Sequence, residues 1–450
     1  MATVASPSGV SADVPRQEDA PGVAEQTPLP AFDVERVRAD FPILQREVNG
    51  RRMVYLDSGN TSHKPRQVLD ALAEHYARHN ANVARSVHTL GTEATEAYEG
   101  ARARVAAFIG AATPDEVVFT KNSTEAINLV AYAFLGASLP GAPADSRERF
   151  ALRPGDEVVI SEMEHHSNIV PWQLLCERTG ATLRWFGITD DGRLDESDVD
   201  ALITERTKIV SLVHMSNILG TVNPTARITA RAHEVGALVM LDCSQSVPHM
   251  PVNVADLGVD FIAFTGHKMC GPTGIGVLWG RATLLAAMPP FLGGGSMIET
   301  VTMERTTFMP PPARFEAGTP PIAQAVGLGA AIDYLTGIGM PAVRSHEQEL
   351  TAYALQALVT VPGLRLVGPV DPVDRGGILS FVMDGIHPHD VGQVLDAEGI
   401  QVRVGHHCAR PVCARFGVPA TTRVSLYLYN TAEEIDALVR GLEAVRKVFG

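Results

Sequence analysis

Cysteine, positive charge and long apolar runs are scarce in this sequence, and each shortage excludes a class of protein. Five cysteines in 450 residues do not form the disulfide framework of a small secreted domain. With 37 basic against 51 acidic side chains the formal charge is −14, which disfavours binding to nucleic acid. No apolar run approaches the roughly 20 residues that span a bilayer, and the N-terminus lacks a signal-peptide pattern. We therefore expect a cytoplasmic protein that binds neither nucleic acid nor membrane.

The chain divides by composition into segments of different character. Residues 1–32 combine frequent Pro with Ala, Ser and Gly, which predicts a disordered tail. Residues 33–53 are predicted to form an N-terminal segment that packs with a small domain. Residues 54–300, where short apolar runs alternate with helical patterns, predict a large domain. Residues 301–450 contain long helices and short strands, which predict a smaller α+β C-terminal domain.

The alternation in the large domain predicts an α/β fold with a mainly parallel central sheet. Continuous apolar strands such as 157–160, 208–213 and 237–241 are separated by segments with helical spacing. Ligands of such sheets bind beyond the carboxyl ends of the strands, so the residues after each strand matter most. One stretch, 137–153, is rich in Pro, Gly and mixed charge and is predicted to be an exposed, mobile loop.

Chemically active residue types follow several of the predicted strands. Asp242 and Lys268 each follow an apolar run, and Ser123 and Thr124 open a helix. A lysine amine for covalent attachment, a carboxylate that keeps a pyridine nitrogen protonated and a helix start that binds phosphate together indicate pyridoxal phosphate. Each signal alone is weak, because an aspartate after a strand is more often a cap or turn former. Their order and spacing together carry the prediction.

Several longer motifs match one family over residues 33–450. They are Tyr55-Leu56-Asp57-Ser58, Ser123-Thr124-Glu125, Glu164-His165-His166-Ser167-Asn168-Ile169-Val170-Pro171-Trp172, Asp242-Cys243-Ser244-Gln245, Gly266-His267-Lys268, Arg314-Phe315-Glu316-Ala317-Gly318-Thr319 and Arg403-Val404-Gly405-His406-His407-Cys408. These resemble the motifs of cysteine desulfurases with the class V aminotransferase fold, specifically the SufS-type (group II) enzymes of the SUF iron–sulfur assembly system. The resemblance implies the pyridoxal-phosphate-dependent transferase fold type I, with the catalytic cysteine loop in the small domain.

The resemblance also implies a role for each matching residue. Lys268 would bind the cofactor covalently and move the Cα proton, Asp242 would pair with the pyridine nitrogen, and Cys408 would receive the sulfur. His165 would stack on the cofactor and serve in proton transfer. The other implied cofactor contacts are Gln245, Ser123, Thr124, Thr265, His267 and, from the second subunit of a homodimer, Thr319. The implied substrate contacts are Arg423, Asn217, Arg403 and His88.

The activity that the resemblance implies is removal of sulfur from L-cysteine. The products would be L-alanine and a persulfide on Cys408, which supplies iron–sulfur cluster assembly through a sulfur-acceptor protein of the SufU or SufE type. Selenocysteine lyase, or another pyridoxal-phosphate β-lyase on the same scaffold, is the alternative. A non-catalytic docking subunit is disfavoured because the catalytic set is intact. A zinc cluster of His406, His407, Cys408 and Cys413 has a spacing unlike common zinc motifs, so no metal is expected.

Two segments depart from the pattern of the family. Residues 83–88 keep the arginine and the last histidine of Val-His-Arg-Gly-x-His, but Ala84 and Ser86 replace the first histidine and the glycine. Residues 59–62, Gly-Asn-Thr-Ser, replace the usual run of small residues. Both segments lie near the substrate entrance in the family. They therefore leave the substrate range less defined than the cofactor.

Overall fold

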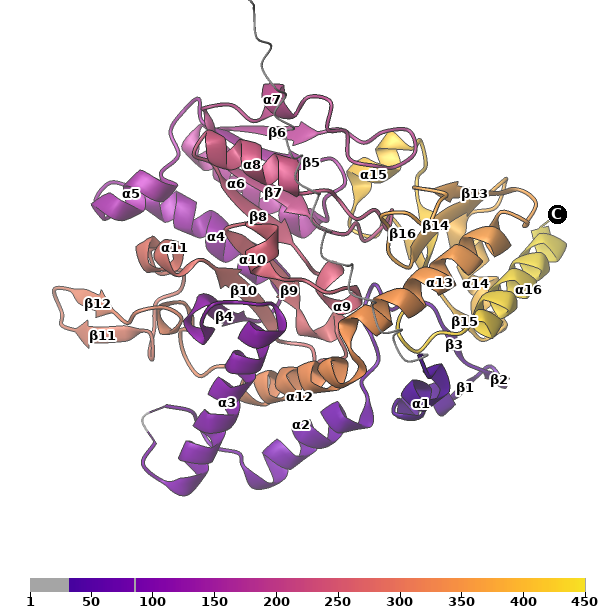
Figure 1. The fold of residues 1–450 in the computed structure, drawn as a ribbon, viewed down its shortest axis with the longest axis horizontal. Coiled ribbons are helices and arrows are strands. Elements are labelled where there is room, and N and C mark those ends of the chain that lie inside the picture. Colours follow the sequence, from indigo (N-terminus) through magenta and orange to yellow (C-terminus); the bar gives the residue numbers. More distant parts are fainter. Residues whose placement is uncertain (1–31, 85, 450) are drawn as a thin grey trace, which may run out of the picture. The chain divides into compact units, whose positions relative to one another are not determined.

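A seven-stranded sheet forms the centre of the structure (Figure 1), a computed structural model that describes residues 32–84 and 86–449. In spatial order its strands are β4 (Val117–Thr120), β10 (Gly276–Gly280), β9 (Phe261–Thr265), β8 (Leu238–Asp242), β7 (Thr207–Val213), β5 (Glu157–Ser161) and β6 (Thr182–Phe186). The five strands from β9 to β6 run parallel, and β10 is antiparallel to both of its neighbours. The predicted α/β class with a mainly parallel sheet is confirmed.

Helices cover both faces of this sheet. They include α2 (Arg66–Arg78), α3 (Thr89–Phe108), α4 (Ser123–Ser138), α6 (Val170–Thr179), α8 (Ala226–Glu234) and α12 (Ile322–Ile338). In β8, Met240 packs in an apolar cluster with α4 and α6, whereas Val239 and Leu241 pack in the cluster that contains α3, α8 and α12. Successive side chains of a strand point to opposite faces. Burial of both faces therefore explains why these strands are continuously apolar.

A second, antiparallel sheet has its own apolar core. Its strands, in spatial order, are β13 (Leu364–Val367), β14 (Ile378–Met383), β17 (Thr421–Ser425) and β16 (Arg403–Gly405), and its helices are α13 (Met340–Leu358), α14 (Pro388–Ala397) and α16 (Ala432–Phe449). Phe381 of β14 and Val424 of β17 pack with Leu438 of α16 in this core. The sheet matters for the site because β16 and β17 place Arg403 directly opposite Arg423.

The N-terminal segment contacts the elements around this second sheet. Helix α1 (Val34–Ala39) is joined to α16 by an ion pair of 2.9 Å between Arg38 and Glu434, and β3 (Val54–Tyr55) pairs in parallel with β15 (Ile400–Gln401). Residues 32–450 form one compact unit, in which α12 packs on α2 and α3. The domain boundary near residue 300 therefore stays a prediction. The predicted tail lies outside the described residues, apart from Phe32.

The remaining elements are short. They are β1 (Glu47–Val48), β2 (Arg51–Arg52), α5 (Ala144–Phe150), α7 (Val199–Leu202), α9 (Ser246–His249), α10 (Val254–Leu257), α11 (Ala282–Ala287), the hairpin β11 (Ile298–Val301) and β12 (Thr306–Phe308), and α15 (Arg410–Arg415). Among the described residues no single helix is long and apolar enough to cross a membrane. Only α12 and α13 together reach that length and composition, as a pair bent by 74°.

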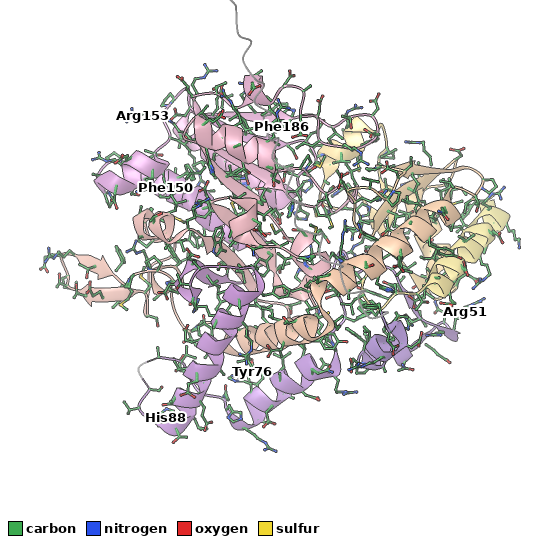
Figure 2. All side chains as sticks on the ribbon, in the orientation of Figure 1. Arg51, Tyr76, His88, Phe150, Arg153 and Phe186 are labelled. Carbon is green, nitrogen blue, oxygen red and sulfur yellow. The ribbon has the colours of Figure 1, made fainter. Side chains whose placement is uncertain are left out.

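The prediction of an exposed loop over residues 137–153 is wrong for the central part of that segment. Helix α5 occupies Ala144–Phe150, and the ring of Phe150 is buried edge-on against Phe134, with ring centroids 5.3 Å apart (Figure 2). The backbone N–H of Leu152 also donates to the hydroxyl of Ser138. One buried aromatic side chain thus fixes a segment whose Pro, Gly and charged residues are typical of a loop.

Candidate active site

A cavity of about 220 Å³ lies at the carboxyl ends of the parallel strands, where such sheets bind ligands. It brings together residues that lie far apart in the sequence, from the segments after β5, β7, β8 and β9 and from the start of α4. The predicted site residues that line it are Ser123, Thr124, His165, Asn217, Asp242, Gln245, Thr265, His267 and Lys268. The other predicted site residues, which do not line it, are Arg403, Arg423, Cys408, Thr319 and His88.

Lys268 and Asp242 supply the two charges of this cavity. Asp242 is the last residue of β8, and its Oδ1 accepts from the backbone N–H and the hydroxyl of Ser244, at 3.0 and 2.6 Å. Lys268 ends the short 3-10 turn that follows β9. Burial lowers the pKa of Lys268 to about 8, against the opposing charge of Asp242. About one tenth of the lysine is therefore an uncharged, nucleophilic amine at pH 7, far more than for a lysine with the usual pKa.

Hydroxyl groups gather where α4 begins. Asn122 caps the helix by accepting from the N–H of Glu125, and Ser123 and Thr124 form its first turn. The hydroxyl of Thr124 lies 2.6 Å from that of Ser167, and the hydroxyl of Ser123 lies 3.0 Å from that of Ser244. Free N–H groups and hydroxyls at the start of a long helix bind phosphate.

His165 lies beside this group of hydroxyls. Its Nδ1 is 2.9 Å from the hydroxyl of Ser167. Burial, reinforced by the charge of Lys268, lowers the pKa of His165 to about 3, so the imidazole is neutral. A neutral ring can stack on an aromatic ligand and can accept or donate a proton.

The residues of the cavity fit pyridoxal phosphate. Within the described chain, the buried Oε1 of Gln245 has no hydrogen-bond partner, while its Nε2 donates to the carbonyl of Gly59 at 2.7 Å. An unpaired buried acceptor is costly, so it indicates a ligand that donates, such as a ring hydroxyl. The start of α4 suits the phosphate, Asp242 a protonated pyridine nitrogen, and the Lys268 amine a covalent bond.

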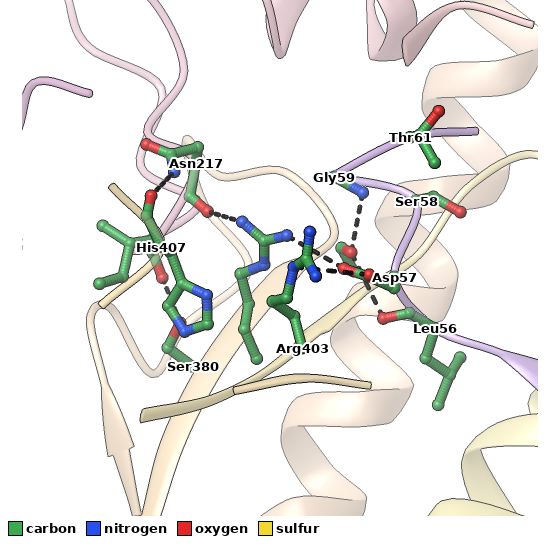
Figure 3. A network of polar contacts seen from close by, with 12 residues as sticks. Leu56, Asp57, Ser58, Gly59, Thr61, Asn217, Ser380, Arg403 and His407 are labelled. Atoms are coloured by element: carbon green, nitrogen blue, oxygen red, sulfur yellow. Dashed lines mark hydrogen bonds and ion pairs between the residues drawn. The ribbon is translucent and has the colours of Figure 1, made fainter. Parts of the chain in front are cut away.

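Two arginines next to the cavity share one carboxylate (Figure 3). Arg423 of β17 donates to Asp57 at 3.2 Å and to the backbone carbonyl of Asn217 at 2.9 Å. Arg403 of β16 lies 3.7 Å from the other oxygen of Asp57. The Nε of Arg423 is buried and has no partner in the described chain. The three side chains leave one net positive charge, together with a free donor, for a carboxylate ligand.

Asp57 is the site residue whose role the sequence did not predict. Its motif is recognisable in the sequence, but nothing local shows that Asp57 pairs with Ser425 of β17 and lies next to Arg403 of β16. Burial raises the pKa of Asp57, and the charges of Arg423 and Arg403 oppose that rise. Ser167 and Ser244, which hold His165 and Asp242 in place, were likewise not predicted as site residues.

Cys408 lies on a strained turn near these arginines. His407 and Cys408 have φ angles of 50° and 55°, in the left-handed region that non-glycine residues rarely adopt. Three contacts hold the turn: His166 N–H donates to the carbonyl of Cys408 at 2.7 Å, Asn217 donates to the carbonyl of His407 at 2.7 Å, and His407 Nε2 lies 2.9 Å from Thr421 Oγ1. The strain thus presents an exposed thiol at a fixed place.

Cys408 is also the one exposed cysteine; the other four are buried, and all five are free thiols. The zinc alternative finds no support in the described part of the chain, where no group of three or more His, Cys, Asp and Glu side chains is placed to hold a metal ion. Cys413, its proposed fourth ligand, is buried in α15.

Thr319 and His88 lie outside the cavity. Thr319 lines a separate pocket of about 300 Å³ with Glu316 and Ala317. It was predicted to reach the site of a second subunit, so its position in one chain leaves that role a prediction. His88 is exposed and caps α3, because its Nδ1 accepts from the N–H of Gly91 at 3.1 Å (Figure 2). Its substrate contact also stays a prediction.

Comparisons with known proteins agree with this geometry. The family model "Aminotransferase class-V" matches residues 54–438. A probable cysteine desulfurase of Streptomyces coelicolor is 62% identical over 94% of this chain and 100% of its own, and a cysteine desulfurase of Dickeya dadantii is 49% identical over 94% and 99%. The crystal structure of the cysteine desulfurase CsdA of Escherichia coli, in its S-sulfonic acid form, superposes with a TM-score of 0.83 at 37% identity, over 93% of this chain and 100% of that one. The chain therefore belongs to the class-V aminotransferase family and has the pyridoxal-phosphate-dependent fold type I.

Proposed function

We propose that this protein is a pyridoxal-phosphate-dependent cysteine desulfurase. It removes sulfur from L-cysteine, keeps it as a persulfide on Cys408 and releases L-alanine. The observation that carries the proposal is the position of one exposed thiol on a strained turn that Asn217, a residue of the cavity, holds through a hydrogen bond of 2.7 Å. Class-V relatives that are named cysteine desulfurases support it.

The cofactor would be held by groups already described. Ser123, Thr124 and the first turn of α4, with Thr265 and His267, would hold its phosphate. Asp242 would pair with its pyridine nitrogen, and Lys268 would bind it covalently. When bound, pyridoxal phosphate supplies an electron sink for the electron pair released at the substrate Cα.

The residues of the chain bind and orient the substrate. Arg423, held by Asp57 and Asn217, takes the substrate carboxylate through its free donors. Lys268, with a pKa lowered to about 8, accepts the Cα proton as an uncharged amine and returns it later as an ammonium. His165 is neutral and lies within the cavity, so it can serve as a second proton carrier.

Cys408 completes the transfer. Its thiolate attacks the sulfur of the substrate, so that an S–S bond forms and the Cβ–S bond breaks. The carbon side gains a proton at Cβ and leaves as alanine, and the enzyme keeps the sulfur as a persulfide. One cysteine and one thiol thus give one alanine and one persulfide, without an external oxidant.

The wider setting follows from the same proposal. An exposed persulfide needs a protein that collects it, which we expect to be a sulfur acceptor of the SufU or SufE type in a SUF iron–sulfur assembly system. The working unit would be a cytoplasmic homodimer, in which Thr319 reaches the cofactor phosphate of the second subunit. Motif similarity to SUF desulfurases supports this setting.

The test measures products from the holoenzyme with L-cysteine and a reductant. Wild type should release alanine and sulfide, and Cys408→Ala should lose both while it keeps the yellow absorbance of bound cofactor. Cys413→Ala, which removes a buried thiol from the neighbouring helix, is the matched control and should stay active. If Cys408→Ala were as active as wild type, the enzyme would be a β-lyase that needs no protein thiol, as expected for the selenocysteine lyase alternative.

A further inference from the structure

Four hydrogen-bond donors converge on one backbone carbonyl beside the cavity, that of His267. The donors are the backbone N–H of Ser62 at 3.0 Å, the hydroxyl of Thr61 at 3.1 Å, the hydroxyl of Ser62 at 3.2 Å and the ammonium group of Lys64 at 3.2 Å. A carbonyl oxygen has two lone pairs and usually accepts one or two bonds. This carbonyl belongs to the peptide group that joins His267 to Lys268.

Each donor in this arrangement has an acceptor within hydrogen-bond distance. Lys64 has three N–H groups, which point to the carbonyls of Ser62 and His267 and to the hydroxyl oxygen of Thr61. The hydroxyl of Ser62 donates to His267 and accepts from the backbone N–H of Cys270 at 2.8 Å. The segment 61–64 therefore contacts the chain on both sides of Lys268. Because four donors surround one carbonyl, rotation of its peptide plane would break several of these hydrogen bonds at once.

The charge of Lys64 is unusual for a structural contact. In the part of the chain that the structure describes, only uncharged oxygens bind its ammonium group, and no carboxylate lies within ion-pair distance. Burial lowers the pKa of Lys64 to about 8. A cation kept away from water without an opposite charge is costly, and an apolar side chain of similar length would fill the same space at a lower cost.

The turn that Lys64 contacts has little structure of its own. It is a 3-10 turn of three residues, Gly266–Lys268, closed by bonds from the N–H groups of Met269 and Gly271 to the carbonyl of Gly266. None of these bonds fixes the peptide plane between His267 and Lys268. Rotation of that plane would swing the long lysine side chain, and a displacement of about 1 Å at a reacting atom can cost roughly 100-fold in rate.

We infer that Thr61, Ser62 and Lys64 form a clamp on the carbonyl of His267 that positions Lys268 for proton transfer at the substrate Cα. The inference rests on the proposed function for the identity of that proton. It also gives a role to Thr61 and Ser62, which belong to one of the two segments in which this chain departs from the family pattern. Thr61 and Ser62 are positioning residues, because they act only through the backbone next to Lys268.

The test compares variants that remove one part of the clamp at a time. Lys64→Met keeps the length of the side chain and removes its charge and donors, whereas Thr61→Val and Ser62→Ala each remove one hydroxyl. Lys208→Met, at the opposite end of β7 from the cavity, is the matched control. For each holoenzyme we would measure kcat and KM for L-cysteine, and the pH midpoint of the visible cofactor absorbance in the absence of cysteine.

For Lys64→Met we expect kcat to fall at least tenfold, with KM within about twofold of wild type because the arginine subsite is untouched. The absorbance midpoint should shift by about half a pH unit or more, because the amine of Lys268 is no longer held at a fixed distance from the charged groups that act on it. The charged groups that act on Lys268, namely Asp242, Arg423 and Cys408, are the same in all variants. Thr61→Val and Ser62→Ala should each lower kcat about two- to fivefold with a smaller shift of the midpoint.

Wild-type kcat and midpoint in a folded Lys64→Met enzyme would overturn the inference. If Lys64→Met does not fold, the two hydroxyl variants decide, and wild-type kcat in both would overturn it equally. A wild-type enzyme that makes no alanine would refute the proposed function alone. The absorbance midpoint, measured without cysteine, would still test the clamp.

Discussion

Asp57 decides how much charge the arginine pair offers to a substrate. It neutralises one of two guanidinium groups and fixes the plane of Arg423 from one side, while the carbonyl of Asn217 fixes it from the other. Because Arg423 is buried and Arg403 is half exposed, Arg423 is the stronger candidate for direct recognition. A guanidinium that is held at two points can still bind a carboxylate through two parallel hydrogen bonds, and an ammonium cannot.

We therefore predict that Arg423→Lys raises KM for L-cysteine by about tenfold or more, with a smaller effect on kcat. The charge is kept in this variant, but the planar fork that meets the carboxylate is lost. Steady-state alanine production over a range of cysteine concentrations measures both constants.

The control for this variant is Arg365→Lys, an exposed residue of β13, the edge strand of the same sheet. It makes the same chemical change without touching the cavity, so its KM should equal that of wild type. An Arg423→Lys enzyme with unchanged KM would show that the substrate carboxylate binds elsewhere.

At the scale of elements, one buried carboxylate joins three segments. Glu316, in the loop that leads to Thr319, receives both ends of the Arg102 guanidinium from α3, at 2.7 and 2.9 Å. It also accepts from the N–H of Phe119 in β4 at 2.7 Å and from the hydroxyl of Tyr98 at 2.9 Å. Both members of the ion pair are almost completely buried. The loop is thereby fixed against the edge of the central sheet.

Glu316→Gln should lower the free energy of unfolding by about 3 kcal/mol, because it leaves the half-exposed Glu99, 2.8 Å away, as the counter-charge of the buried Arg102 guanidinium. Urea unfolding followed by circular dichroism measures the change. The exposed pair of Arg51 and Glu398, 3.0 Å apart, gives the control: Glu398→Gln should cost less than about 1 kcal/mol. Equal effects of the two variants would contradict the argument.

The sequence predicted the elements and residues whose signal is local. Strands that are buried on both faces are continuously apolar, so the central sheet and the strand-end position of Asp242 followed from the pattern alone. Asp57 acquires its role only when the chain after β3 pairs with β17 and meets Arg403 of β16, which no local pattern shows. Helix α5 was missed because its stability depends on Phe150 in the core, whereas its composition is that of a loop.

At the scale of the whole molecule, burial keeps several histidines uncharged. Their pKa values are lowered to about 3 for His165 and His407 and to about 4 for His63, His214 and His267. In an unfolded chain the same groups titrate near pH 6.5. Their contribution to stability is therefore complete above about pH 6.5 and is lost as the pH falls toward 4. Glu164, whose pKa burial raises to about 8, acts in the opposite direction.

We predict that the free energy of unfolding in urea is lower at pH 5.5 than at pH 7.5, by about 1 kcal/mol for each of these histidines. Unfolding must then take up protons, and the histidines outnumber the carboxyl groups with raised pKa values that oppose them, Glu164, Asp57 and Glu347. A free energy that stays level or rises between pH 7.5 and pH 5.5 would show that these rings are already protonated in the folded state.

The strained turn at Cys408 has a practical consequence. Since it exposes one thiol while the other four are buried, a maleimide reagent should modify the native protein once per chain. A fluorophore or spin label can therefore be attached beside the cavity without removing any native cysteine. The resulting probe would report the arrival of a docking protein directly, as a change in its signal.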